Sequence, residues 1–164
     1  MERSSFFSKG SPTGEALAEW WDGLVANPGA RAELRRAHDL TAVVTSPAFQ
    51  RFRRRMVMAG LPEDESRRDQ LAVIAGVLAR LKASNELRLP QAMRGEDKPR
   101  VSELRFRRLL DSPSTEDLFT GLRRVLPLID SAADIHQLAA DIWYWGDKVR
   151  KRWAYDYPWP AKTD

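Results

Sequence analysis

The stretch Asp141-Ile-Trp-Tyr-Trp-Gly-Asp-Lys-Val-Arg-Lys-Arg-Trp153 joins three tryptophans to four cations near the carboxyl end of the chain. Its apolar residues extend an upstream pattern at spacings of three and four, typical of one helix face. That stripe comprises Ile135, Leu138, Ile142, Trp145, Val149 and Trp153. We therefore predict one long helix, started by Ser131 with Asp134, whose apolar face anchors a core while its cations face outward.

Apolar faces of the same kind recur upstream, between residues that start and stop helices. Good amino-terminal caps are Ser11, Ser46, Ser102 and Ser114. Stops are expected at Asn27-Pro28-Gly29, at Gly60-Leu61-Pro62 and at Pro113, with a kink or end at Pro127. No segment of useful length alternates polar and apolar residues, so a sheet is not expected.

These signals predict an all-α fold of about seven to nine helices, arranged as two small helical bundles joined by a loop. Residues 1–12 are expected to form a flexible tail, residues 13–84 the N-terminal helical part, and residues 101–164 the C-terminal helical part. Pro90, Gly95 and Pro99 mark residues 85–100 as the linker.

The composition points to a polyanionic partner. The 164 residues carry 27 Lys and Arg against 23 Asp and Glu, and most of the cations are arginines, which suit phosphate recognition. Cysteine is absent, which excludes disulfides and thiolate metal sites and fits a reducing cytoplasm. The sequence shows neither a signal peptide nor an apolar run long enough to span a membrane.

Residue patterns that indicate catalysis or cofactor binding are missing. His38 and His136 lie in different halves, and the glycines at positions 10 and 14 lack the lysine of a phosphate-binding loop. The carboxylates cluster at helix starts, where the helix dipole accounts for them. We therefore expect no catalytic residue, no metal and no cofactor.

Arginine-rich helix faces are the candidate functional feature. One such face is usually only a solvated surface, but here it recurs on several helices and could form a groove that follows a phosphate backbone. The predicted nucleic-acid-binding residues are Arg35, Arg36, Arg51, Arg54, Arg55, Arg105, Arg108, Arg123, Arg124, Lys148, Arg150 and Arg152.

The aromatic residues divide into two predicted groups. The tryptophans that fall on apolar stripes, expected in the core, are Trp20, Trp21, Trp145 and Trp153. Those expected at a surface or a partner are Trp143, Tyr144 and Trp159.

Several of these segments, taken in order, resemble a known family. They are an early Trp-containing helix followed by Leu34-Arg35-Arg36, the Phe49 to Arg55 helix, Ser102-Glu103-Leu104-Arg105-Phe106 running into Leu109-Leu110, Leu122-Arg123-Arg124-Val125-Leu126-Pro127, and Trp143-Tyr144-Trp145-Gly146-Asp147-Lys148. In this order they resemble the CasB-type small subunit of Cascade, the type I-E CRISPR surveillance complex.

The resemblance implies a non-catalytic, all-helical subunit that is present in two copies along the guide RNA and contacts the backbone and large subunits of the complex. It also implies that the basic surface holds the displaced non-target DNA strand and stabilises the R-loop, whose formation is nearly balanced in free energy. The residues best matched to strand contacts are Arg36, Arg54, Arg105, Arg123, Arg124, Lys148 and Arg150.

Two other functions remain open from the residues alone. A stand-alone helical DNA-binding regulator would need short polar side chains to read bases, and the Phe49 to Met58 helix offers only Gln50. A protein adaptor would use the same basic faces to bind acidic partners.

Overall fold

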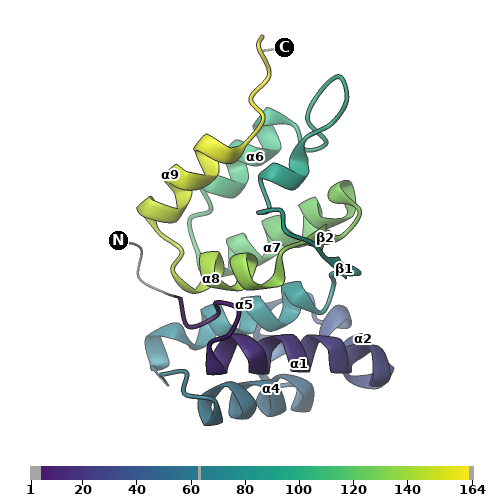
Figure 1. The fold of residues 1–164 in the computed structure, drawn as a ribbon, viewed down its shortest axis with the longest axis vertical. Coiled ribbons are helices and arrows are strands. Elements are labelled where there is room, and N and C mark those ends of the chain that lie inside the picture. The colour runs from purple at the N-terminus through teal and green to yellow at the C-terminus, as the bar shows by residue number, and fades with distance from the viewer. Residues whose placement is uncertain (1–4, 63, 163–164) are drawn as a thin grey trace.

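The computed structural model describes residues 5–62 and 64–162, and it confirms the predicted all-α class. Within these residues there are nine α-helices, in agreement with the expected number, and only two very short strands. Two tiers are visible in Figure 1, with the N-terminal helices below and the C-terminal helices above.

The lower tier contains α1 to α5, and serine, asparagine or aspartate caps begin its first four helices. Ser11 and Ser46 accept backbone N–H bonds at two of these starts, as predicted. The elements are α1 (Pro12–Ala26), α2 (Pro28–Arg36), α3 (Leu40–Val44), α4 (Pro47–Met58), the 3-10 helix η1 (Glu65–Arg67) and α5 (Arg68–Leu78).

The upper tier contains α6 to α9. Ser102 and Ser114 cap its first two helices as predicted, and α7 ends at Val125 just before Pro127. The elements are α6 (Glu103–Leu110), α7 (Thr115–Val125), the 3-10 helix η3 (Leu126–Ile129), α8 (Ile135–Trp143) and α9 (Asp147–Asp156).

The segment between the tiers is packed against the core. Its strand β1 (Ala83–Ser84) pairs in parallel with β2 (Ala132–Ala133) of the upper tier, and the 3-10 helix η2 (Gln91–Met93) follows. Leu89 and Met93 are buried in the one hydrophobic cluster that residues of both tiers share. The tiers therefore have a common core, and the boundaries at residues 84 and 101 stay a prediction.

The predicted long carboxy-terminal helix is wrong, because it is broken between Trp143 and Asp147. Trp153 Nε1 donates a hydrogen bond of 2.7 Å to the Asp141 carboxylate. In a continuous helix these two residues would lie about 18 Å apart along the axis, at 1.5 Å per residue. Gly146, with its low helix propensity, lies in the break that lets α9 fold back onto α8.

The amino-terminal segment differs from the expected flexible tail over residues 5–11. Phe7 is fully buried, and its ring lies in a T-shaped contact with the Trp143 ring, with the two ring centroids 5.9 Å apart. Its carbonyl oxygen lies 2.7 Å from His136 Nδ1 of α8. Residues 1–4 of the predicted tail lie outside the described residues.

Candidate nucleic-acid interface

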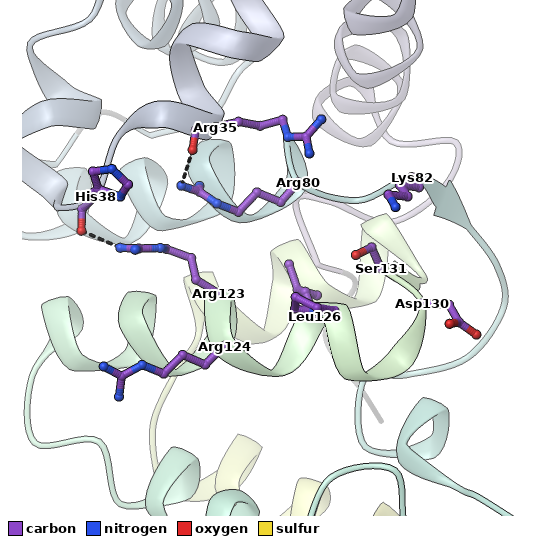
Figure 2. Close-up of a pocket in the computed structure, with 10 residues that line it drawn as sticks. Arg35, His38, Arg80, Lys82, Arg123, Arg124, Leu126, Asp130 and Ser131 are labelled. Atoms are coloured by element: carbon purple, nitrogen blue, oxygen red, sulfur yellow. Dashed lines mark hydrogen bonds between the residues drawn. The ribbon is translucent and has the colours of Figure 1, made fainter.

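A depression at the junction of the tiers gathers cations from three parts of the chain. We call it the junction groove, and Figure 2 shows its lining residues. Its volume of about 580 Å³ is in the range of small-ligand sites, but its lining is cationic where such sites are mostly apolar. Its five cations are Arg35, Arg80, Lys82, Arg123 and Arg124.

Two of these arginines are held rigidly by backbone carbonyl groups. Arg80 donates to the carbonyl oxygens of Gly76 at 2.6 Å and of Arg35 and Ala37 at 2.8 Å each. Arg123 donates to the carbonyl oxygen of His38 (Figure 2). The two guanidinium groups thus satisfy carbonyls at and just after the end of α2 and join that helix to α5 and α7.

The same two guanidinium groups lie over one aromatic ring. The centroid of the buried Phe119 ring is 5.3 Å from the Arg80 guanidinium carbon and 5.1 Å from that of Arg123. Gly76 of α5 leaves room for this ring, because a Cβ there would lie 3.0 Å from it. Packing and cation–π contacts therefore hold both cations at the groove.

The groove carries an excess of positive charge. Burial lowers the pKa of Arg80 to about 10, and the nearby cations of Arg123 and Arg35 contribute to the lowering. Arg80 is still charged near neutral pH. The carboxylate of Asp130 in the lining already pairs with Arg100. A bound anion would relieve the repulsion among the remaining cations.

A second depression lies between α6 and α7, and we call it the α6–α7 groove. Its lining includes four arginines, Arg105, Arg107, Arg108 and Arg124. Its two acids have partners within the protein. Asp111 pairs with Arg150 at 2.9 Å, and Asp117 accepts a hydrogen bond from the Ser114 hydroxyl at 2.7 Å.

The structure therefore brings five of the predicted residues into two adjoining grooves. Arg35 and Arg123 line the junction groove, Arg105 and Arg108 line the α6–α7 groove, and Arg124 lines both.

The predicted residues of α4 lie on a separate surface. Arg51 and Arg54 line a shallow depression on α4 with no residue in common with the two grooves. Arg55 pairs with Glu19 of α1 at 3.1 Å. Arg36, at the end of α2, is exposed but lines neither groove.

Two of the three predicted cations of α9 have internal partners. Arg150 donates to the Leu110 carbonyl oxygen at 2.8 Å and pairs with Asp111. Arg152 pairs with the buried Asp141. These bonds tie α9 to α6 and α8, so we leave both arginines out of the interface. Lys148 is exposed and lines neither groove.

Trp143 does not lie at the expected surface. It is 5% exposed, with Phe7 against its ring and the Arg67 guanidinium carbon 5.3 Å from its centroid. Tyr144 and Trp159 are 42% and 45% exposed, and Trp159 still contacts the Phe106 ring edge-on at 5.6 Å.

Three groove cations were not among the predicted site residues: Arg80, Lys82 and Arg107. Arg80 and Lys82 follow the apolar run of α5 and form no basic helix face, so the local pattern carries no signal for them. Arg107 lies in the arginine-rich α6, and counting every arginine of that helix would have included it.

Neither a metal site nor a membrane span is present in the part of the chain that the structure describes. No three or more His, Asp or Glu side chains in it come close enough to hold a metal ion. None of its helices has the length and apolar character needed to cross a bilayer.

Comparisons with known proteins agree with the motifs seen in the sequence. A chain of the crystal structure of E. coli Cascade bound to a PAM-containing dsDNA target has a similar fold, with a TM-score of 0.69 and 24% sequence identity. The similarity covers 87% of this chain and 92% of that chain. The comparison with curated proteins found no match. Residues 30–157, most of the chain, match the family described as CRISPR-associated protein Cse2 (CRISPR_cse2). Because this match rests on the residue pattern over most of the helices, and not on the fold alone, the chain belongs to the CRISPR-associated protein Cse2 family.

Proposed function

We propose that this protein is a non-catalytic subunit of a cytoplasmic, CRISPR RNA-guided DNA surveillance complex. In that role it holds the displaced non-target DNA strand and stabilises the R-loop through a basic surface that is indifferent to sequence. Its partners would be DNA, the guide RNA complex, the backbone and large subunits of Cascade, and a second copy of itself.

The observation that carries this proposal is the pair of adjoining grooves. Six of their cations are exposed and have no ion-pair partner among residues 5–62 and 64–162: Arg35, Lys82, Arg105, Arg107, Arg108 and Arg124. Each cation that neutralises a phosphate releases counterions and adds salt-dependent affinity that does not depend on base sequence.

A holding role fits the energetics of R-loop formation. The RNA–DNA heteroduplex is about as stable as the DNA duplex that it replaces, so backbone contacts to the displaced strand can tip the exchange. A rigid groove suits this role, because less conformational entropy is lost when the strand binds. Arg80 and Arg123 do not supply the strand contacts themselves; their bonds at and just after the end of α2 hold the walls of the junction groove in place.

The carboxylates support a non-catalytic role, because several of them are engaged in stabilising helix starts. Asp39, Asp117 and Asp134 lie at the starts of α3, α7 and α8. Glu116 accepts from the Leu40 backbone N–H at 3.1 Å and 3.2 Å.

The test is the lifetime of the R-loop in the assembled complex. The complex would be built with the triple variant R35A/K82A/R124A and with a matched control, R94A/K98A/K151A, which removes three exposed cations outside both grooves. Each lost phosphate contact reduces the slope of log affinity against log salt concentration, which we call the salt slope, by about 0.7 for a single strand. Losing three contacts should therefore flatten the salt slope by about 2 and shorten the R-loop lifetime by about tenfold or more.

The readout separates strand holding from assembly. Native mass spectrometry first establishes that each variant enters the complex in the same copy number. An R-loop lifetime that is unchanged in the groove variant, or reduced equally in the control, would contradict the proposal. Dependence on the sequence of the displaced strand would instead favour a base-reading regulator.

A further inference from the structure

The two grooves meet at one residue. Arg124 lies on α7 and lines both the junction groove and the α6–α7 groove. In Figure 2 the side chains of Arg123 and Arg124 extend to the same side of α7, and Arg123 reaches toward His38 whereas Arg124 lies apart from it. These consecutive residues of α7 therefore have different roles. Arg123 bonds to the His38 carbonyl just after α2, whereas Arg124 is exposed where the two grooves meet.

Positive charge continues across this meeting point. On one side lie Arg35 and Lys82, and on the other lie Arg105 and Arg108. The acids of the linings do not outweigh it. Asp130 and Asp111 are paired with arginines, and Asp117, which accepts a hydrogen bond from the Ser114 hydroxyl, is outnumbered by the four arginines of the α6–α7 groove. A strand lying in one groove would therefore have its next phosphates attracted into the other.

The groove linings favour contact with phosphates over contact with bases. Their apolar members are aliphatic, for example Leu126 and Pro127 in the junction groove and Leu104 and Val125 in the α6–α7 groove. Within the described part of the chain no tryptophan, tyrosine or phenylalanine lines either groove, and the one aromatic ring in the linings is the His38 imidazole, so the linings offer many more contacts for phosphates than for stacked bases.

We propose that one single strand runs through both grooves in succession and crosses α7 at Arg124, so that its phosphates contact both tiers of the protein. This path rests on the proposed strand-holding function and specifies its course. Arg35, Lys82, Arg124, Arg105 and Arg108 contact the strand, whereas Arg80 and Arg123 are positioning residues.

The experiment measures affinity, salt slope and stoichiometry together. The purified full chain would be titrated with an oligothymidylate of about 12 nucleotides, within the usual site size of single-strand binders. The variants are R35A/K82A in the junction groove, R105A/R108A in the α6–α7 groove, and R94A/K151A as a control with the same change in charge. Circular dichroism and thermal unfolding establish that each variant folds.

A continuous path gives a distinctive result. The unaltered protein binds one strand, and each groove variant still binds one strand, with weaker affinity and a salt slope flatter by about 1.4 for two lost phosphate contacts. The control keeps the affinity of the unaltered protein within about twofold, as expected for surface charges that line neither groove and are screened by salt.

Three outcomes would overturn the path. Two separate sites would show as two strands per protein, falling to one in each groove variant with the remaining affinity unchanged. A strand confined to one groove would leave one of the two variants without effect. No binding by the unaltered protein at low salt would also contradict the path. R-loop lifetime in the assembled complex is measured separately, so the proposed function can stand where the path fails.

Discussion

Replacing Asp141 by alanine should sharply reduce the stability of the fold, because this carboxylate joins α8 to α9. It is 1% exposed, accepts the Trp153 Nε1 hydrogen bond at 2.7 Å and pairs with Arg152. Burial raises its pKa, while Trp153 and the Arg152 cation act in the opposite direction. The side chain is thus a costly buried charge whose partners depend on it.

The size of the effect follows from what the substitution leaves behind. Removing one partner of a buried ion pair costs about 3–5 kcal/mol, because the other charge stays buried without compensation. The Arg152 side chain is 32% exposed and water can reach part of it, so the lower half of that range applies. At about 2–4 °C per kcal/mol for a chain of this size, Tm should fall by about 10 °C.

Urea unfolding, followed by tryptophan fluorescence and by circular dichroism, measures this loss. The matched control is D111A, which breaks the ion pair of α6 with Arg150, where the Asp111 side chain is 72% exposed. Exposed pairs contribute about 0–1 kcal/mol. If D141A and D111A lowered the free energy of unfolding by the same small amount, the reasoning that Asp141 locks α9 onto α8 would be refuted.

Three further results are expected. F7A should cost about 3–5 kcal/mol of unfolding free energy, whereas its half-exposed neighbour variant F6A should cost under about 1 kcal/mol in the same urea titration. G76A should lower Tm, although alanine usually stabilises a helix by about 1 kcal/mol relative to glycine, because its Cβ would lie 3.0 Å from the buried Phe119 ring; a higher Tm would contradict this packing. Because the pKa of Asp141 is raised in the fold, the folded chain binds a proton at this carboxylate more readily than the unfolded chain. The free energy of unfolding, relative to that of D141N, should therefore rise as pH falls from the raised pKa toward the ordinary aspartate value. A pH series of urea titrations on both proteins measures this change.

Much of the fold is predictable because its helix boundaries are set by local chemistry. Ser11, Ser46, Ser102 and Ser114 cap the helices they were expected to cap. Pro127 ends α7 for the same local reason. Such signals depend only on neighbouring residues, so the helix boundaries that they set do not depend on tertiary packing.

The errors in the fold arise where contacts distant in sequence override a local pattern. The apolar stripe from Ile135 to Trp153 has the pattern of one helix. The bonds of Asp141 to Trp153 and Arg152, which no local pattern signals, require α9 to fold back onto α8. Trp143 appeared free for a surface because its partner Phe7 comes from the other end of the chain.

The sequence predicted that the candidate site would be an arginine-rich surface, but it predicted less well which residues form that surface. Arginine-rich faces pointed to Arg124 and Arg105, but the pattern could not distinguish them from Arg150 and Arg152, whose acidic partners lie on other helices. Arg80 was missed because it stands alone after the end of a core helix, and its place in the groove depends on contacts with the Arg35 carbonyl of α2 and the Phe119 ring of α7, which are distant in the sequence.

The position of α5 has a consequence for how the molecule opens. Every residue from Leu71 to Ala79 is buried, and the helix packs against α2, α3 and α4 on one side and against α7 and α8 on the other (Figure 1). Neither tier can detach without exposing this helix to water. In native-state hydrogen exchange, the amides of α5 should therefore be the last to exchange and should report the free energy of global unfolding, even though the ribbon suggests two halves.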